Sequence, residues 1–366
     1  MISKKKCLVV VFLPVGQLAR YPDQMARFEF LQRHYAVGAV ITSSNTAVAG
    51  AEATHVIDQK NPLLFSLGVS RVLRQSPINY DFIYVIGLPA VIAFALRRPQ
   101  RPVIAYAPTH FEQHFGIDSK RGWLSAAVGR LKQGLFFMGL RRMTSVMAIS
   151  RQLAALYQHR APRVVMIPMG VDLRRYTPRS ASAAVERLNI VYPGSGGAGR
   201  GIDLLVECAR LVQQRGAPVV FHLVGCQDDL LREALATDPG LAEVIQVYPL
   251  MAYAQVIELY KSMDAGVSLL ENNKFYAVCP PQKIFEYMAA GLPILCNAIP
   301  THNDYVGDNA VIVEWQAEAL YAGVLDMRLR YPQLAAAAAR VVTELHPYAQ
   351  VTVERAFVNE IDRVCN

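Results

Sequence analysis

The chain has 366 residues, of which 53% are hydrophobic and 18% are charged, and its formal net charge is +8. This length exceeds one ordinary hydrophobic core, so we expect two domains of roughly 150 residues each. The composition excludes a disordered protein, and the positive charge favours an anionic partner such as nucleotide phosphate, acidic lipid or nucleic acid. The six cysteines lack close pairing, which indicates reduced core thiols in a cytosolic protein and no zinc site.

The N-terminus places an apolar run after basic residues, as a signal peptide would. No small-x-small cleavage motif follows, and an amphipathic pattern continues at once, so we interpret residues 7–13 as a buried first strand. No apolar stretch reaches the roughly 18–20 uncharged residues that a membrane span needs. We therefore expect a protein that does not cross a membrane.

Short apolar runs alternate with helical patterns through residues 1–172. Strands that are apolar on both faces and separated by helices form parallel sheets with helices on each side. The pattern predicts an α/β domain with a parallel sheet. After the first strand, the expected strands are 36–42, 81–87, 102–108, 145–150 and 163–168.

Residues 173–187 lose this periodicity and collect Arg, Ser, Pro and Ala, which is typical of an inter-domain linker. The alternation resumes over 188–346 and predicts a second α/β domain, and residues 347–366 predict a last amphipathic helix. The expected strands of the second domain are 188–194, 218–225, 244–250, 265–270, 292–296 and 310–315.

A glycine-rich stretch, YPGSGGAGRGID at 192–203, lies between a strand and a helix. Glycine lets backbone N–H groups converge on an anion, and the helix start and Arg200 add positive charge there. The stretch also matches G-x-G-x-x-G, but the acidic residue expected about 20 positions later in a dinucleotide site is missing. Two interpretations stay open: a tight turn, or a phosphate site that includes Gly194, Ser195, Gly196 and Arg200.

A second motif, PPQKIFEYMAAG at 280–291, predicts a short helix that begins at a proline and ends at Gly291. Lys283 and Glu286 are three residues apart and share a face. One interpretation is a solvated ion pair. The other is a ligand site, because a helix at the carboxyl end of a strand faces the crevice of an open α/β sheet. There a carboxylate can accept ribose hydroxyls and a Lys can contact phosphate.

A basic segment at 119–143 has cations at 120, 121, 130, 132, 141 and 142, with aromatic residues that include Trp123 and Phe136 between them. It predicts either a helix that rests on anionic lipid or a core helix with charged ends. No nucleic-acid recognition motif accompanies it, so a nucleic-acid partner is not expected.

Several segments together resemble the large family of retaining GT-B glycosyltransferases. They are IPMGVDLRRYTP, the glycine-rich stretch with its helix, FHLVG, VIQVYPLMAYAQVIELYKSMDAGVSLL and PPQKIFEYMAAGLPIL. The resemblance covers residues 164–300 strongly and the N-terminal half in outline. It implies two Rossmann-like domains that face a central cleft: an acceptor-binding domain (1–172), onto which the helix 347–366 crosses back, and a nucleotide-sugar-binding domain (188–346).

The resemblance also implies roles for residues of the second domain. Arg200 and Lys283 are expected to contact the donor diphosphate, and Glu286 matches the second Glu of the family's Glu-x7-Glu motif, which holds the ribose. Val278 stands where the first Glu would be. We therefore expect the backbone amides of Val278 and Cys279 to contact the donor sugar.

In the first domain, the family carries a His beside the transferred sugar, after the strand 102–108. His110 is nearest to that place and His114 is the alternate, while an ordinary surface histidine is the other interpretation. The backbone of Gly16 is expected near the donor phosphates.

The resemblance thus implies a glycosyltransferase of the hexosyltransferase type that acts in polysaccharide biosynthesis. Its donor would be a UDP- or GDP-sugar, its acceptor hydroxyl would belong to a lipid-linked saccharide or glycan, and transfer would retain the anomeric configuration. No DxD-type motif is visible, so we expect no metal and no cofactor. The expected location is cytoplasmic, with peripheral association at the inner face of the cell membrane. Two rivals stay open: a GT-B sugar-nucleotide epimerase or hydrolase, and a catalytically silent sugar-nucleotide-binding subunit.

Overall fold

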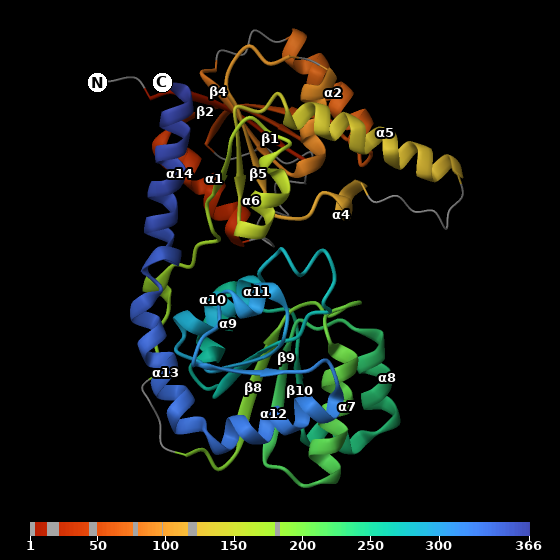
Figure 1. Cartoon of the computed structure of the whole chain (residues 1–366), viewed down its shortest axis with the longest axis vertical. Helices are drawn as coiled ribbons and strands as arrows, with labels where there is room; N and C mark the ends of the chain where they lie inside the picture. Colours follow the sequence, from red (N-terminus) through yellow and green to blue (C-terminus); the bar gives the residue numbers. More distant parts are fainter. Residues whose placement is uncertain are drawn as a thin grey trace. The chain divides into compact units, whose positions relative to one another are not determined.

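A computed structural model describes residues 4–12, 22–43, 50–75, 80–96, 98–115, 123–179 and 184–366. The chain divides into two compact units, one of Met1–Gly170 together with Val351–Asn366 and the other of Val171–Gln350 (Figure 1). The sequence analysis places the corresponding boundaries at 172 and 347. Each unit is an α/β structure built on its own parallel sheet.

The first unit contains a seven-stranded parallel sheet in the order β3-β2-β1-β4-β5-β6-β7. All six strands predicted from the sequence in this half are present, and three of them, β4, β5 and β6, are buried along their whole length. The strand β3 was not predicted, because its sequence AEATHV is partly exposed and lacks an apolar run. The strands are β1 Lys6–Val11, β2 Ala36–Thr42, β3 Ala51–Val56, β4 Phe82–Ile86, β5 Val103–Ala107, β6 Ser145–Ala148 and β7 Val164–Met166.

Helices connect these strands, and the last helix of the chain belongs to this unit. In α14, Phe357 packs edge-on against Phe30 of α1 and Tyr84 of β4, and α14 lies along α1 in Figure 1. Glu360 accepts two hydrogen bonds from Arg163, at 2.7 and 2.8 Å. The helices are α1 Pro22–His34, α2 Pro62–Gln75, η2 Leu88–Val91, α3 Ile92–Leu96, α4 Glu112–Phe115, α5 Trp123–Leu140, α6 Arg151–Gln158 and α14 Gln350–Cys365.

A buried ion pair fastens the end of the first unit to α1. Arg27 is fully buried, and its Nε lies 3.1 Å from Oδ2 of Asp23. Its Nη2 donates to the carbonyls of Ile167 and Pro168 at 2.9 and 3.0 Å. A buried charge is tolerated only with such partners, so this pair fixes the stretch through which the chain leaves the unit.

The second unit contains a six-stranded parallel sheet in the order β10-β9-β8-β11-β12-β13, and all six of its strands were predicted. The order runs outward from β8 in one direction and from β11 in the other. The carboxyl ends of β8 and β11 therefore form the switch point at which open α/β sheets bind ligands. The strands are β8 Leu188–Pro193, β9 Val219–Val224, β10 Ile245–Tyr248, β11 Ala265–Ser268, β12 Ile294–Asn297 and β13 Ala310–Val313.

The helices of the second unit surround this sheet (Figure 1). One of them, α8, was not predicted, although Asp228 accepts from the amide of Leu230 and caps its first turn. The helices are η4 Leu173–Arg175, α7 Ile202–Gln214, α8 Asp229–Thr237, η5 Pro239–Glu243, α9 Tyr253–Tyr260, α10 Gln282–Ala289, α11 Pro300–Asn303, α12 Ala317–Leu329, α13 Tyr331–Glu344 and η6 His346–Tyr348.

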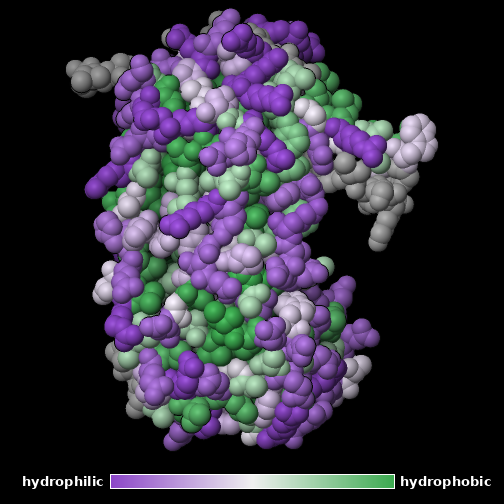
Figure 2. Space-filling view, viewed as in Figure 1, coloured by the Kyte–Doolittle hydropathy of each residue, from purple (hydrophilic) through white to green (hydrophobic). Residues whose placement is uncertain are grey.

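Hydrophilic side chains cover much of the face shown in Figure 2, and apolar side chains form scattered patches between them. Over the ranges that the structure describes, none of the helices combines the length and the apolar character needed to cross a bilayer.

Candidate active site

The glycine-rich stretch follows β8 at the switch point of the second sheet. Its glycines at 194, 196, 197, 199 and 201 all have positive φ. Gly201 precedes α7 with φ of 64°, and a Cβ added there would lie only 2.4 Å from Cβ of Leu269. The carbonyl of Gly199 accepts from the amide of Glu271, at 2.9 Å. These positions require glycine, because the loop is left-handed and lies directly against the segment that follows β11.

Asp228 fixes the middle of this loop from the side. Its Oδ2 accepts from the amide of Gly197 at 2.8 Å, while its Oδ1 caps α8. The sequence shows this carboxylate only as a late acidic residue without a place in a dinucleotide motif. In the structure it shapes the glycine loop, and the amide of Gly197 is already used.

Lys283 lies beside this loop, at the start of α10. Its Nζ is 3.7 Å from the centre of the Tyr192 ring and close to Gly194. Burial, and after it the positive charge of Arg200, lower the pKa of Lys283 from its ordinary 10.5 to about 7, while Glu286 acts in the opposite direction. Two cationic side chains thus lie close together where water is partly excluded. An anion bound there would offset both the desolvation of Lys283 and its repulsion by Arg200.

Glu286 lies one turn further along α10 and is only 6% exposed. Its Oε2 accepts from the hydroxyl of Tyr260 at 3.0 Å, and the hydroxyl of Tyr253 also hydrogen-bonds the carboxylate. Burial raises the pKa of Glu286, while the two hydroxyls and Lys283 act in the opposite direction. The interpretation of Lys283 and Glu286 as a solvated surface pair is therefore wrong, because the carboxylate is buried among tyrosines.

Helix α10 has the ends that the sequence indicates. Pro281 is its N-cap, and Gly291, with φ of 68°, follows its C-cap. The amides of Gly291 and Leu292 donate back to the carbonyls of Met288 and Tyr287, at 3.0 and 2.9 Å. This closing turn ends the helix just before β12.

The segment between β11 and α10 carries Val278 and Cys279, both half-buried. The amide of Val278 lies 3.4 Å from the carbonyl of Phe275, a long contact within the segment itself. Their expected contact with a donor sugar stays a prediction. Asn297 fixes the start of this segment. Its side-chain oxygen accepts from the amide of Leu270 at 2.9 Å, and its side-chain nitrogen donates to the carbonyl of Leu270 at 2.7 Å.

Further polar residues near this segment escaped the sequence analysis. His302 is fully buried between the hydroxyl of Ser268, at 3.0 Å, and the carbonyl of Asn297, at 2.8 Å. Burial lowers the pKa of His302 to about 4, so it is a neutral structural residue at ordinary pH. The sequence signal that could have found it is the polar cluster IPTHND directly after an apolar strand.

The candidate residues of the first unit are on other elements. His110 follows β5, is 7% exposed and stacks on Phe111 with ring centres 4.8 Å apart. Its Nδ1 accepts from the amide of Glu112 at 3.2 Å, and Nε2 of His114 lies 3.0 Å from Oγ1 of Thr109. Their catalytic roles stay predictions. Gly16 lies outside the described residues.

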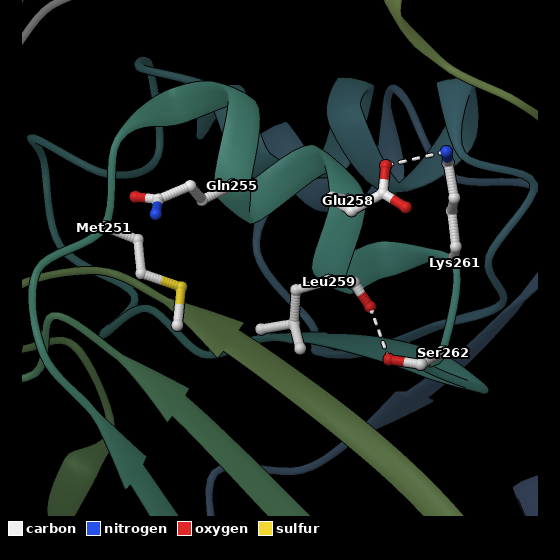
Figure 3. A pocket seen from close by; sticks show the side chains of 6 residues that line it. All are labelled: Met251, Gln255, Glu258, Leu259, Lys261 and Ser262. Carbon is white, nitrogen blue, oxygen red and sulfur yellow. Dashed lines mark hydrogen bonds and ion pairs between the residues drawn. The ribbon is translucent and has the colours of Figure 1, made fainter.

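A surface pocket of about 570 Å³ lies elsewhere, on the outer face of α9 (Figure 3). Glu258 and Lys261 point toward each other and form an ion pair at 2.7 Å. The hydroxyl of Ser262 donates to the carbonyl of Leu259 at 2.9 Å. The polar groups named here are therefore paired with each other. The residues that line this pocket are Met251, Gln255, Glu258, Leu259, Lys261 and Ser262.

Comparison with known proteins finds relatives of the segment that carries this site. Residues 187–328, which include Arg200, Lys283 and Glu286, match the family model described as glycosyl transferases group 1. The D-inositol 3-phosphate glycosyltransferase of Geodermatophilus obscurus is 29% identical over 210 residues, which cover 52% of this chain and 46% of that protein. The enzyme of the same name from Acidothermus cellulolyticus is 26% identical over 216 residues, with coverages of 54% and 47%. The chain thus spans about half the length of the curated relatives that it matches.

Solved structures share the fold over nearly the whole chain. Sucrose-phosphate synthase from Thermosynechococcus elongatus has a TM-score of 0.73 at 13% identity and covers 99% of both chains. HepE of Anabaena, solved in complex with UDP-glucose, has a TM-score of 0.71 at 14% identity, with coverages of 98% of this chain and 100% of that one. The chain has the fold of the GT-B glycosyltransferases, and its second unit carries a stretch that matches the family of glycosyl transferases group 1.

Proposed function

We propose that this protein is a glycosyltransferase that moves a sugar from a UDP- or GDP-sugar to an acceptor hydroxyl with retention of configuration. The observation that carries the proposal is the meeting of the glycine loop, Arg200 and Lys283 at the switch point, one helical turn from the buried Glu286. A nucleoside diphosphate has the matching chemistry, because its phosphates need cations and its ribose needs an acceptor of two hydroxyl bonds. The named relatives are sugar transferases, which supports the same reaction class.

In this proposal the protein acts mainly by stabilising the departing diphosphate. Negative charge grows on that group as its bond to the anomeric carbon breaks, and the two neighbouring cations Arg200 and Lys283 would neutralise it. The acceptor hydroxyl attacks on the face that the diphosphate leaves, with His110 beside the transferred sugar. These cations supply the charge that a metal ion would otherwise provide, so the proposed transfer is metal-independent.

Incubation with radiolabelled UDP- and GDP-sugars and a membrane lipid extract tests this function. Label that enters lipid or glycan supports transfer, and label that returns as an epimer or free sugar supports an epimerase or hydrolase. Binding of the donor without turnover supports a catalytically silent subunit, the rival that Val278 in place of an acidic residue favours. The Lys283→Met and Glu286→Gln variants serve as controls, since both should lose transfer if the site is the one described.

A lipid-linked acceptor would require the protein to approach a membrane, and we propose that α5 makes this approach. The helix contains no acidic residue. Leu124, Val128, Leu131 and Met138 are exposed at helical spacing, and Trp123 at the helix start is 77% exposed. Exposed apolar side chains beside cations are typical of helices that lie on anionic bilayers.

The structure changes which residues of the basic segment can take part. Phe136, expected at the lipid, is fully buried in the core. Arg142 donates to the carbonyls of Phe94 and Ala95, both at 2.9 Å, and thus has a structural role. Lys120 and Arg121 lie outside the described residues. The cations on α5 itself are Arg130 and Lys132.

Co-sedimentation with vesicles tests the membrane proposal. Each cation near an anionic surface contributes about 1 kcal/mol, so replacing Arg130 and Lys132 with Gln should weaken binding roughly 30-fold. The control pair Arg340→Gln and Arg355→Gln removes the same charge from exposed positions on α13 and α14. Equal binding to neutral and acidic vesicles, or an equal loss of vesicle binding in the two variant pairs, would refute the role of α5. Neither result would bear on the proposed donor site.

A further inference from the structure

The chain enters the second unit through a short segment that is fixed at both of its ends. At the start, the amide of Val171 donates to the carbonyl of Tyr348, and the amide of Gln350 donates to the carbonyl of Val171, both at 2.9 Å. The short helix η4 follows, and its N-cap is Asp172. Tyr176 comes next and is 7% exposed. We call residues 171–176 the leading segment.

Tyr176 connects the leading segment to Glu286 through one further tyrosine. Its hydroxyl lies 2.7 Å from the hydroxyl of Tyr253, at the start of α9. Tyr253 in turn hydrogen-bonds the Glu286 carboxylate, which also accepts from Tyr260 at the other end of α9. A carboxylate accepts only, and each hydroxyl has a single proton, so Tyr253 donates to Glu286 and Tyr176 donates to Tyr253.

The hydroxyls of Tyr253 and Tyr260 differ from that of Tyr287, which has a purely structural role. Tyr287, on α10 next to Glu286, donates to the backbone carbonyls of Val191 and Val267, both at 3.1 Å. Its bonds stay within the sheet. Tyr253 and Tyr260 instead donate to the one acid that the proposed function assigns to the ligand.

Two donors leave the Glu286 carboxylate with capacity for two more hydrogen bonds, since an ionised carboxylate has about four acceptor positions. A ribose offers two hydroxyls. The tyrosines would therefore hold the carboxylate in one rotamer while the vacant positions stay available, a preorganisation that lowers the entropy cost of binding. Loss of either donor would let the side chain turn.

We propose that Tyr253 is a positioning residue that aims Glu286 at the ribose of the donor nucleotide and links its occupancy to the leading segment. This inference rests on the proposed function. A ribose that bonds Glu286 shares the carboxylate with Tyr253, and a change in that bond reaches Tyr176 through a single hydroxyl. Glu286, held by Tyr253, would thus recognise the pair of ribose hydroxyls of the substrate.

Calorimetric affinities for UDP and GDP, compared with their 2′-deoxy forms, test the positioning role. The wild-type protein should prefer the ribose form, and Glu286→Gln should abolish this preference. Tyr253→Phe keeps the ring and should lower the preference about fivefold, the effect of about one hydrogen bond. Tyr248→Phe is the matched control, because that hydroxyl bonds His222 and Gln246 and leaves Glu286 untouched. A merely structural Tyr253 would weaken ribose and deoxyribose ligands equally and leave the preference unchanged.

Hydrogen exchange of the leading segment tests the link. Nucleotide should slow the exchange of residues 171–176 in the wild type and in Tyr248→Phe, and this protection should be lost in Tyr253→Phe. Tyr176→Phe, which removes only the donor to Tyr253, gives the same answer if Tyr253→Phe does not fold. A wild-type protein that binds neither nucleotide overturns the proposed function and this inference together. The inference alone is overturned if Tyr253→Phe keeps the full ribose preference and if nucleotide still protects residues 171–176 in Tyr253→Phe and Tyr176→Phe.

Discussion

Lys283 gives the proposed donor site a defined dependence on pH. Burial and Arg200 lower the pKa of this side chain to about 7, so about half of the free protein carries the charge at neutral pH. A bound diphosphate favours the charged form and raises this pKa again. The complex then holds more protons than the free protein, so the affinity is full below pH 7 and is lost as the pH rises from 7 toward the pKa of the complex.

The magnitude follows from the two pKa values. If the diphosphate restores Lys283 to an ordinary value of about 10, the affinity should fall roughly 50-fold between pH 7 and pH 9. At pH 7 the same linkage requires binding to take up about half a proton per site. Below pH 6 the affinity should be flat, because Lys283 is charged in both states.

Titration calorimetry in buffers of different ionisation enthalpy measures this uptake directly. The ligand should be an intact sugar nucleotide, because the second ionisation of a terminal phosphate near pH 6 would otherwise add its own protons. Lys283→Arg keeps the charge at every pH and is the control, and it should bind with little change from pH 6 to pH 9. An affinity that stays level or rises above pH 7 in the wild type, or a decline that persists in Lys283→Arg, would refute the reasoning.

Three further predictions concern the same site. Arg200→Ala should weaken nucleoside-diphosphate binding by at least ~1.5 kcal/mol, the contribution of one charge-assisted hydrogen bond, and unchanged calorimetric affinity in a folded variant would contradict this. Gly201→Ala should lower the free energy of unfolding by about 2 kcal/mol or more, because its Cβ would meet Leu269 at 2.4 Å. Gly216→Ala, with φ of 65° but open space around its Cβ, should cost only about 1 kcal/mol, and equal denaturant midpoints for the two variants would contradict the clash. Transfer should survive EDTA, so activity that vanishes with the chelator and returns with magnesium would exclude the metal-independent scheme.

Most of the fold follows from the sequence because buried parallel strands read as unbroken apolar runs. β4, β5 and β6 show this pattern and were predicted close to their observed bounds. β3 lies at the sheet edge with several exposed positions, so no run marks it. α8 is short and begins with polar residues, and the capping residue Asp228 is its one clear signal in the sequence. The elements that escaped the prediction are those in which burial does not determine the residue type.

The candidate site was predictable where it depends on local chemistry and unpredictable where it depends on contacts between distant residues. The glycines and cations within 192–203 allow a phosphate site, and the short helix that carries Lys283 and Glu286 allows a ligand site. The resemblance to the GT-B family was needed to prefer these interpretations over a tight turn and a solvated ion pair. The tyrosines that hold Glu286 lie 26 and more residues away in sequence, and their role appears only when α9 packs beside α10. No pattern in the sequence marks such a pair.

Aromatic side chains explain why Lys283 and Glu286 can do separate work although they lie on one face of one helix. Opposite charges three residues apart would ordinarily neutralise each other. Here the ammonium group lies over the Tyr192 ring, which attracts it through the face of the ring, and the carboxylate is held by the hydroxyls of Tyr253 and Tyr260. Each charge is therefore stabilised by a neutral partner that a ligand can share. In the proposed complex the diphosphate supplies the negative charge opposite Lys283, and the ribose hydroxyls donate the remaining hydrogen bonds to Glu286. A ligand without the diphosphate should therefore leave Lys283 without a counter-charge, and a ligand without the ribose hydroxyls should leave Glu286 with unused acceptor positions.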